Sequence, residues 1–387
     1  MPGPDDDRVH RFGCVLHVRS CTRFDPGPNG HQEPVRIVVT GATGNVGTAL
    51  VRILREQDCS VTGLARRIPP AEGPYAAVDW VPGDLARPAS LEPVLRGADA
   101  LVHLAWAVNP SAGDPPMAAT NLTGTRRLLD AAAAAGVPRI VCASSVAAYS
   151  PAPRWERVRE DWPCDGISAS AYSRGKAELE RLLDVFAREH PDVLLTRVRP
   201  CAILQRDAGG EFGRWLLSPL LPAGIVAVPG FPLPLWPELR LQVVHAQDVA
   251  EAVWLALSAG FSGPVNLASD PVLRADDVAG LLGALRLPVP RPLLSGAAWS
   301  LWRAGVQPLH PGWLALADEA ALADTTLART ELGWRPRRDA AAVLAEFADG
   351  LRDQAATSAK ALAPRPATLR ERLATLSWGR PSHQSQA

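Results

Sequence analysis

A tyrosine and a lysine four residues apart, Tyr172 and Lys176, are the pair in this sequence best suited to proton transfer. They lie in the stretch AYSRGKAELE, which predicts a helix, so both side chains project from one helical face about one turn apart. A nearby ammonium stabilises a phenolate, so this spacing predicts a lowered pKa for Tyr172 and proton transfer near neutral pH. The alternative is an ordinary pair of surface neighbours, because this spacing is common.

Ser145 supports a chemical role for Tyr172 and Lys176. The run RIVCASS predicts a buried strand that ends at Ser144 and Ser145, upstream of Tyr172. A hydroxyl at the carboxyl end of a parallel strand faces the crevice in which ligands bind. We therefore take Ser145, Tyr172 and Lys176 as the candidate catalytic residues.

Alternating strands and helices must position these residues. Short apolar runs predict strands at 35–40, 60–65, 78–83, 99–105, 139–144 and 193–199. Amphipathic or alanine-rich stretches predict helices at 46–56, 121–136 and 168–190. Strands without polar alternation, separated by helices, are typical of a parallel sheet covered on both faces, so we predict an α/β fold with a doubly wound parallel sheet.

Three glycines follow the first predicted strand, in the stretch VVTGATGNVGTAL. Gly41 permits a tight turn, Gly44 lets the backbone approach a pyrophosphate, and Gly47 lets the helix pack against the sheet. The phosphates would lie beside Asn45 and Val46, where free N–H groups and the helix dipole favour an anion. The strand before and the helix after favour a dinucleotide site in a Rossmann fold over an ordinary strand-to-helix turn.

Two arginines follow the second predicted strand, in the stretch VTGLARRIPPAEG. Arg66 and Arg67 occupy the region where an NAD-binding protein carries an acidic residue for the ribose hydroxyl. Two guanidiniums suit a ribose 2′-phosphate, so NADP is predicted, with NAD as the alternative cofactor. Solvated surface arginines are the structural alternative.

The chain resembles the extended short-chain dehydrogenase/reductase family, of the NAD-dependent epimerase/dehydratase type. The resemblance covers about residues 34–351 and rests on motifs in the family's order. These are the glycine motif, GDL at 83–85, HLA at 103–105, NLTGTRRLLDAA at 121–132, SSVAAYS, Tyr-x-x-x-Lys, RVRPCAIL, VVHAQDVAEAV, GPVNLAS and LGWRP.

The resemblance implies roles for the three candidate catalytic residues. Tyr172 would be the catalytic acid/base, and Lys176 would orient the nicotinamide ribose and tune Tyr172. Ser145 would form a hydrogen bond with the substrate oxygen.

The resemblance also implies four cofactor contacts. Asp84 and Leu85 would flank the adenine, and Ala105 and Trp106 would line the path of the cofactor. Each position has a structural alternative: Asp84 could cap a turn, and Trp106 could pack in the core. Asn121, in the next predicted helix, could either contact substrate or tie backbone groups together.

Two departures from the family limit the choice of substrate. SSVAAYS lacks the acidic pair of the sugar-nucleotide dehydratases, and RVRPCAILQRD lacks the Tyr-Gly-Pro of many sugar-nucleotide epimerases. The segments 212–236 and 287–313, which would close over substrate, contain five tryptophans: Trp215, Trp236, Trp299, Trp302 and Trp313. Such a lining suits an apolar small molecule, whereas the alternative is the ordinary core of a small second domain.

We therefore predict an NAD(P)-dependent oxidoreductase that transfers a hydride between nicotinamide and a carbonyl or secondary alcohol of a small apolar substrate. One alternative is an NAD-retaining epimerase that acts on a sugar-nucleotide-like substrate. The other is a non-catalytic NADP-sensing protein of the same fold, which would not need Ser145, Tyr172 and Lys176 for chemistry.

Composition excludes other classes of partner. The 387 residues contain 40 basic and 40 acidic side chains, so there is no excess charge for nucleic acid. Six cysteines without metal-ligand spacing predict reduced thiols in the cytoplasm and no metal site. The charge-free run 215–237 holds six prolines and two glycines, which predicts a buried or ligand-facing segment and no membrane partner.

The same patterns predict four parts of the chain. Residues 1–33 read as a disordered leader and residues 34–200 as the dinucleotide-binding Rossmann core. Residues 201–351 form a mixed substrate-binding region with returning Rossmann elements, and residues 352–387 form a loosely ordered tail. The oligomeric state stays open, with a homodimer as the candidate.

Overall fold

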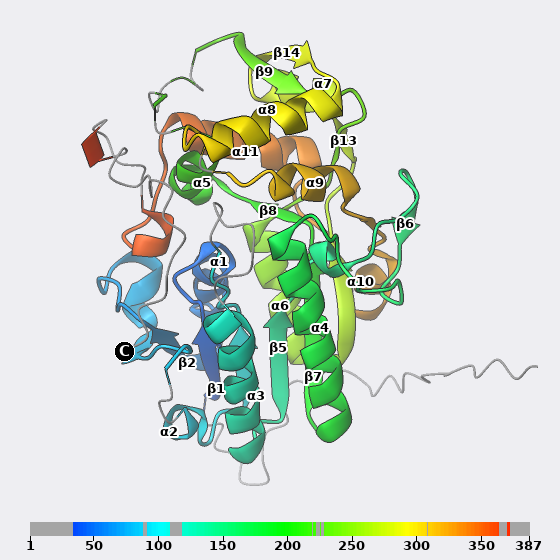
Figure 1. The fold of residues 1–387 in the computed structure, drawn as a ribbon. Coiled ribbons are helices and arrows are strands. Elements are labelled where there is room, and N and C mark those ends of the chain that lie inside the picture. Colours follow the sequence, from blue (N-terminus) through cyan, green and yellow to red (C-terminus); the bar gives the residue numbers. More distant parts are fainter. Residues whose placement is uncertain are drawn as a thin grey trace, which may run out of the picture.

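A parallel sheet of seven strands forms the centre of the molecule (Figure 1). The computed structural model describes residues 34–87, 91–108, 118–218, 220–221, 225, 228–307, 309–363 and 370–371; the predicted leader lies outside them. The strand order is β12-β7-β5-β4-β1-β2-β3, which confirms the predicted doubly wound fold. The strands are β1 (Val35–Thr40), β2 (Cys59–Ala65), β3 (Asp79–Pro82), β4 (Ala100–His103), β5 (Arg139–Ala143), β7 (Leu194–Pro200) and β12 (Gly263–Leu267).

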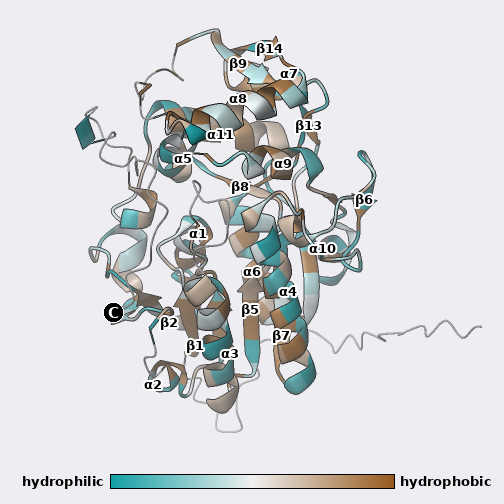
Figure 2. Ribbon diagram, in the orientation of Figure 1, coloured by the Kyte–Doolittle hydropathy of each residue, from teal (hydrophilic) through white to brown (hydrophobic). Residues whose placement is uncertain are grey.

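Helices cover both faces of this sheet because both faces are apolar (Figure 2). Successive side chains of a strand point to opposite faces, so Ile37 and Val39 share one core cluster and Val38 belongs to another. The first cluster includes α1 (Asn45–Leu54) and α6 (Ala246–Ala259). The second includes α2 (Glu92–Leu95), α3 (Thr125–Ala134) and α4 (Ala171–Glu189).

A smaller region lies above the carboxyl end of the sheet (Figure 1). It has its own core, in which Trp236, Leu344 and Phe347 are buried. Its strands are β8 (Ala202–Leu204), β9 (Phe231–Leu235), β10 (Arg240–Leu241), β11 (Val243–His245), β13 (Leu273–Arg274) and β14 (Ala284–Pro288). Its helices are η4 (Arg206–Ala208), α5 (Gly209–Leu216), α7 (Ala275–Leu281), α8 (Arg291–Arg303), α9 (Gly312–Glu319) and α11 (Ala340–Arg352).

Short elements complete the described chain, and the part of the predicted tail that is described packs against the fold. These elements are η1 (Gly73–Ala77), η2 (Ala119–Gly124), η3 (Val146–Ala148), β6 (Arg157–Val158), β15 (Leu322–Ala323), α10 (Thr326–Glu331) and η6 (Lys360–Leu362). Where a loose tail was expected, Ala359 and Leu362 are buried and the Thr357 hydroxyl lies 3.1 Å from that of Tyr75. Burial of these two apolar side chains holds the segment against the fold.

A buried ion pair ties α4 to the sheet. Arg199, near the end of β7, donates from Nε and Nη2 to the two carboxylate oxygens of Glu180 at 2.8 and 2.7 Å. Its Nη1 donates to the Tyr149 hydroxyl at 2.9 Å and to the Glu160 carbonyl at 2.8 Å. Burial alone would raise the pKa of Glu180, but the hydrogen bonds and charge of Arg199 outweigh it and lower this pKa. The position of α4 therefore depends on a fully compensated charge pair.

We predict that Arg199→Met lowers the free energy of unfolding by about 3 kcal/mol, because a buried carboxylate loses its main partner. Glu180 would keep weaker support from Arg197, at 3.2 Å, and from the Ser144 hydroxyl. The control is Arg181→Met, which removes an exposed pair with Glu178 and should cost less than about 1 kcal/mol. Urea unfolding measures both variants, and equal stabilities would contradict the role of the buried pair.

Candidate active site

The glycine turn after β1 is so closely packed that two of its three glycines leave no room for a side chain. Gly41 has a φ of +74°, and a Cβ there would lie 2.6 Å from the backbone nitrogen of Ala105. A Cβ on Gly47 would lie 2.1 Å from the Gly41 carbonyl oxygen, so both positions require glycine. Around Gly44, a Cβ would meet only that carbonyl, at 3.3 Å, among the described residues. The first turn of α1 has no side-chain cap and no acid, so its N–H groups suit an anion.

The two residues that follow Gly44 play different parts. Asn45 donates from Nδ2 to the Ile203 carbonyl at 3.0 Å and accepts from Gln205 Nε2 at 2.8 Å, so its side chain is used within the protein. Val46 packs against the core beneath α1. Asn45 and Gln205 therefore connect the start of α1 to β8 and to the residue that follows it. Sequence reasoning missed this residue, because a single glutamine after a short strand has no motif.

The residues predicted to hold the adenosine half of the cofactor lie at the ends of β2 and β3. Arg66 and Arg67 are exposed directly after β2, and neither has an ion pair within the described part of the chain. Asp84 accepts from the backbone nitrogen of Ala86 at 3.0 Å, which is the turn-capping alternative. Leu85 is buried in the core beside α2 and α3. The two guanidiniums are thus free to meet an anion.

A chain of hydrogen bonds fixes the loop after β4. His103 lies between the hydroxyls of Thr40, at 2.6 Å, and Thr125, at 2.7 Å. Burial, with the charge of a nearby lysine, lowers the pKa of His103 to about 3, so the ring is neutral, as expected for a core histidine. Asn121 accepts from the backbone nitrogen of Ala107 at 2.7 Å and donates to its carbonyl at 2.8 Å. Asn121 therefore ties backbone groups together.

The fold brings the candidate catalytic residues together at the carboxyl end of β5. Ser145 caps η3: its Oγ accepts from the backbone nitrogen of Ala147 at 3.1 Å and donates to the Pro200 carbonyl at 3.3 Å. Tyr172 lies in the first turn of α4, partly buried. Burial raises the pKa of Tyr172, and a hydrogen bond with Ser145 opposes this rise without reversing it.

The prediction that Lys176 lowers the pKa of Tyr172 is therefore wrong. The Nζ of Lys176 donates to the Ala143 carbonyl at 2.9 Å and lies 5.9 Å from the centroid of the Tyr172 ring. Burial lowers the pKa of Lys176 to about 8. The spacing along the helix correctly placed both side chains on one face, but burial dominates, so the pKa of the phenol rises.

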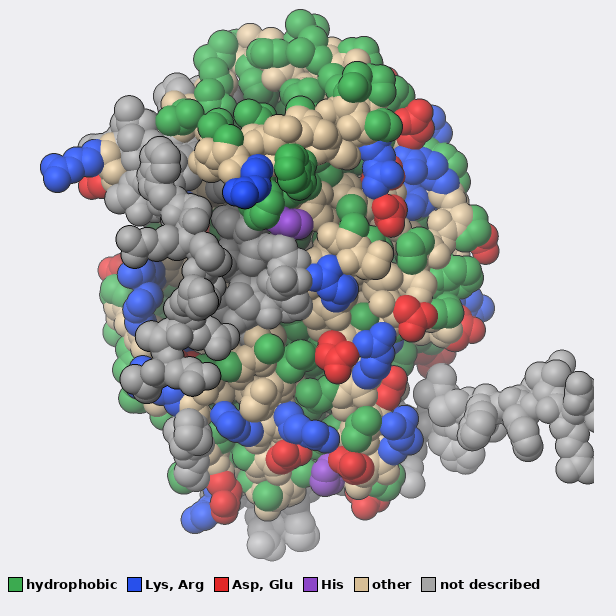
Figure 3. All heavy atoms as spheres, in the orientation of Figure 1, with side chains coloured by type: hydrophobic (Ala, Val, Ile, Leu, Met, Phe, Trp, Pro, Cys, Tyr) green, Lys and Arg blue, Asp and Glu red, His purple; other side chains and the backbone are tan. Residues whose placement is uncertain are grey.

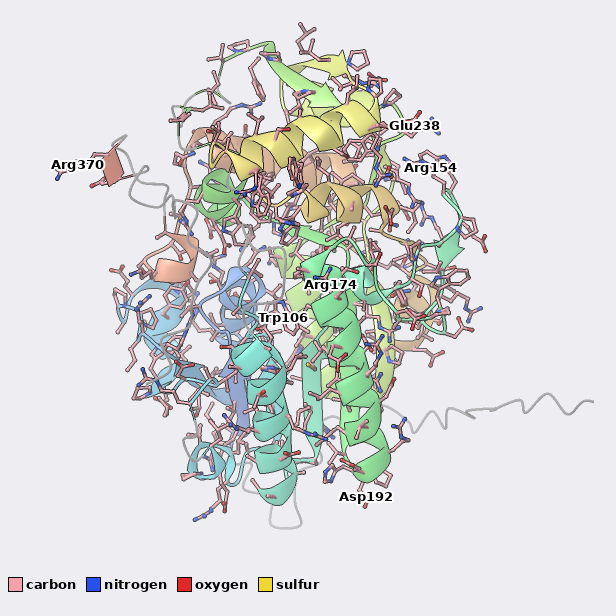
Figure 4. All side chains as sticks on the ribbon, viewed as in Figure 1. Trp106, Arg154, Arg174, Asp192, Glu238 and Arg370 are labelled. Atoms are coloured by element: carbon pink, nitrogen blue, oxygen red, sulfur yellow. The ribbon has the colours of Figure 1, made fainter. Side chains whose placement is uncertain are left out.

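Two indoles lie near the phenol of Tyr172. The Trp106 ring lies at 6.5 Å from the Tyr172 ring, edge to face, and the Trp313 ring at 5.2 Å. Lys176 Nζ is 3.7 Å from the centroid of Trp106, a distance that allows a cation–π interaction. Figure 4 shows Trp106 beside the first turns of α4, and a Cβ on Gly175 would lie 3.3 Å from its ring. Trp106 therefore belongs to the site.

The other predicted lining tryptophans have other surroundings. Trp236 is buried in the core of the smaller region and donates to Asp318 Oδ1 at 2.9 Å. Trp302 packs on His310, with ring centroids 4.6 Å apart. Trp299 is 55% exposed. Trp215 stacks on Phe212, with centroids 5.4 Å apart. Of these five tryptophans, Trp313 is the one whose ring contacts Tyr172 among the described residues.

Known proteins resemble this chain over most of its length. An uncharacterised protein of Mycobacterium tuberculosis is 28% identical over 315 residues, which make up 81% of this chain and 30% of the relative. The chain thus spans about a third of that relative's length. The dTDP-6-deoxy-L-talose 4-dehydrogenase (NAD(P)(+)) of Kitasatospora kifunensis is 29% identical over 336 residues, 80% of this chain and 93% of the relative.

A solved structure and a family model also match this chain. The UDP-glucose 4-epimerase of Thermus thermophilus, in complex with NAD, superposes with a TM-score of 0.61 at 22% identity, over 82% of this chain and 99% of the other. The model of the NAD dependent epimerase/dehydratase family matches residues 37–268, which span β1 to β12. The chain belongs to the NAD dependent epimerase/dehydratase family.

Proposed function

We propose that this protein is an NADP(H)-dependent oxidoreductase that interconverts a carbonyl and a secondary alcohol on a small apolar molecule. The observation that supports this most is the position of Tyr172, whose ring contacts two indoles and has Ser145 and Lys176 beside it. A proton donor, a second hydroxyl and a cation thus meet in one place, which is the set that carbonyl reduction requires.

Tyr172 serves as the proton donor in the direction of reduction. Its raised pKa keeps the phenol protonated at neutral pH, ready to donate to an oxygen on which negative charge develops. Ser145 supplies a second hydrogen bond to that oxygen by turning its hydroxyl from the Pro200 carbonyl. A bound nicotinamide would supply or accept the hydride. Lys176, held over the Ala143 carbonyl, would bind the adjoining ribose hydroxyls.

The cofactor would lie along the carboxyl edge of the sheet. The glycine turn with the first turn of α1 would bind the pyrophosphate, and Ala105 with Trp106 would line the path to Tyr172. The free guanidiniums of Arg66 and Arg67 favour NADP over NAD.

The apolar substrate is supported by Trp313, which brings an indole face against the catalytic phenol. The Kitasatospora relative is named for a dTDP-sugar, so a sugar-nucleotide-like substrate is the second candidate, by oxidation or by epimerisation. A panel of apolar ketones, secondary alcohols and nucleotide sugars, followed at the nicotinamide absorbance and by product analysis, separates them. Tight NADPH binding without turnover on any of these would favour a cofactor sensor. The cytoplasmic location and the homodimer remain predictions from the sequence.

We predict that Tyr172→Phe lowers kcat by about 10² to 10⁴, because the acid/base hydroxyl is lost while the ring still packs. The dissociation constant for NADPH, measured by titration, should stay unchanged. Tyr75→Phe is a matched control: Tyr75 is also buried, but its hydroxyl contacts Thr48 and Thr357, so kcat should not change. Turnover of Tyr172→Phe near the wild-type rate would exclude Tyr172 as the proton donor.

We predict that Arg66→Ala weakens NADPH binding about 10- to 150-fold and leaves NADH binding nearly unchanged. The reason is the loss of a charge-assisted bond to the 2′-phosphate. Arg55→Ala, an exposed arginine at the other end of α1, should affect neither cofactor. Calorimetric titration measures both affinities, and a wild-type preference for NADH would refute the NADP assignment.

We predict that kcat/KM falls as the pH rises through about 8, because Lys176 then loses its charge. Trp106→Leu should move this fall to lower pH by about one unit, since loss of the indole face disfavours the ammonium. Trp106→Phe should restore most of the shift. Trp313→Leu, which removes the indole stacked on Tyr172, serves as the control. A pH profile unchanged in Trp106→Leu would rule out the cation–π contribution.

A further inference from the structure

Two long segments of the smaller region contain no acidic residue. Residues 212–237 and 278–317 lack Asp and Glu entirely, although the chain as a whole holds 40 acidic residues among 387. The charged side chains of these segments are all arginines, apart from one histidine: Arg214, Arg286, Arg291 and Arg303. We call the surface formed by the described residues of these two segments (212–218, 220–221, 225, 228–237, 278–307 and 309–317) the apolar cap.

The two segments lie side by side in the fold. Strand β9 of the first pairs in parallel with β14 of the second along their whole length, from Phe231 with Ala284 to Leu235 with Pro288. The Ser218 hydroxyl also donates to the Val306 carbonyl at 2.6 Å. In Figure 3 hydrophobic side chains gather at the top of the molecule, over β9, β14 and α8. The strand pairing and this hydrogen bond therefore join the two segments of the cap.

The cap exposes large hydrophobic side chains that a protein surface normally hides. Of eleven such exposed side chains in the described part of the chain, nine belong to the cap: Leu216, Leu220, Leu221, Val228, Leu285, Leu287, Leu293, Trp299 and Leu301. Four of them fall in the run 215–237, which the sequence predicted to be buried or ligand-facing. Clustering of this kind marks an interaction surface.

Helix α8 has the pattern of an interfacial helix. None of its residues is buried, although between Arg291 and Arg303 it carries no charge. Leu293 is 67% exposed and Trp299 is 55% exposed. Apolar side chains with two tryptophans, Trp299 and Trp302, followed by Arg303 suit the boundary between headgroups and acyl chains, where such an arginine reaches the headgroups.

The arginines of the cap indicate which kind of partner fits this surface. Arg286 and Arg291 are paired with acids outside the cap, Asp276 at 2.6 Å and Glu319 at 2.9 Å. Arg303 has no ion pair among the described residues. If two caps met in a symmetric dimer, Arg303 would find no acid, because neither face offers one. A bilayer with anionic headgroups supplies both an apolar layer and negative charge.

We propose that the apolar cap binds the surface of a lipid bilayer that contains anionic lipid, with α8 lying parallel to the membrane plane. The protein would rest on one leaflet and not cross it. In agreement with this, no helix in the described ranges is long and apolar enough to span a bilayer.

The test is cosedimentation of the full chain with vesicles of phosphatidylcholine, alone or mixed with phosphatidylglycerol. The wild type should bind the mixed vesicles more tightly, and added salt should weaken this preference. Replacing both Leu293→Glu and Trp299→Glu should weaken binding at least about tenfold, because two apolar anchors are lost. Arg303→Gln should weaken binding to mixed vesicles about fivefold and leave binding to pure phosphatidylcholine unchanged.

Trp155→Glu is the matched control. Trp155 is 49% exposed but lies outside the cap, so this variant should bind vesicles like the wild type. Melting temperatures near the wild-type value would establish that all variants are folded. The proposal is overturned if the wild type binds neither kind of vesicle, or if Trp155→Glu weakens binding as much as the double variant. It is also overturned if the wild type self-associates in sedimentation velocity and Leu293→Glu with Trp299→Glu makes it monomeric, since the cap would then be a protein interface.

Discussion

The placement of helix α4 depends on a charge pair that water does not reach. Glu180 and Arg199 are 2% and 4% exposed, so neither charge is tolerable without the other. Arg199 extends the constraint to Tyr149 and Glu160, which in turn bond to Asn266 on β12. The first turn of α4, with its phenol, is thus held by contacts that reach β7 and β12 of the sheet.

Burial, more than mutual attraction, sets the protonation states around the phenol. It raises the pKa of Tyr172, lowers that of Lys176 to about 8 and keeps His103 neutral. Each shift favours the uncharged form, as desolvation demands. Trp106 acts in the opposite sense, because its ring face favours the ammonium. The site therefore balances an apolar environment against one aromatic contact, and suits proton donation at neutral pH.

Local patterns predicted the sheet and the meeting of Ser145 with Tyr172, because strand runs, glycine turns and helical spacing act over a few residues. Local patterns do not predict contacts between segments that are far apart in the sequence. Trp313 reaches Tyr172 only because α9 folds back over α4, and Trp236 and Trp299 both lie in apolar stretches but have opposite exposure. The sign of the Tyr172 pKa shift also depends on burial by such segments, which spacing along one helix does not report.

The pairing of α1 with α6 has a consequence for synthesis of the chain. The apolar face of α1, with Leu50 and Leu54, is covered by a helix that begins about 200 residues later, at Ala246. At a translation rate of about 5 to 20 residues per second, this face leaves the ribosome roughly 10 to 40 s before its partner exists. Strand β12, at the edge of the sheet, emerges later still. We therefore expect the nascent N-terminal half to need chaperones that shield apolar helices until α6 has been made.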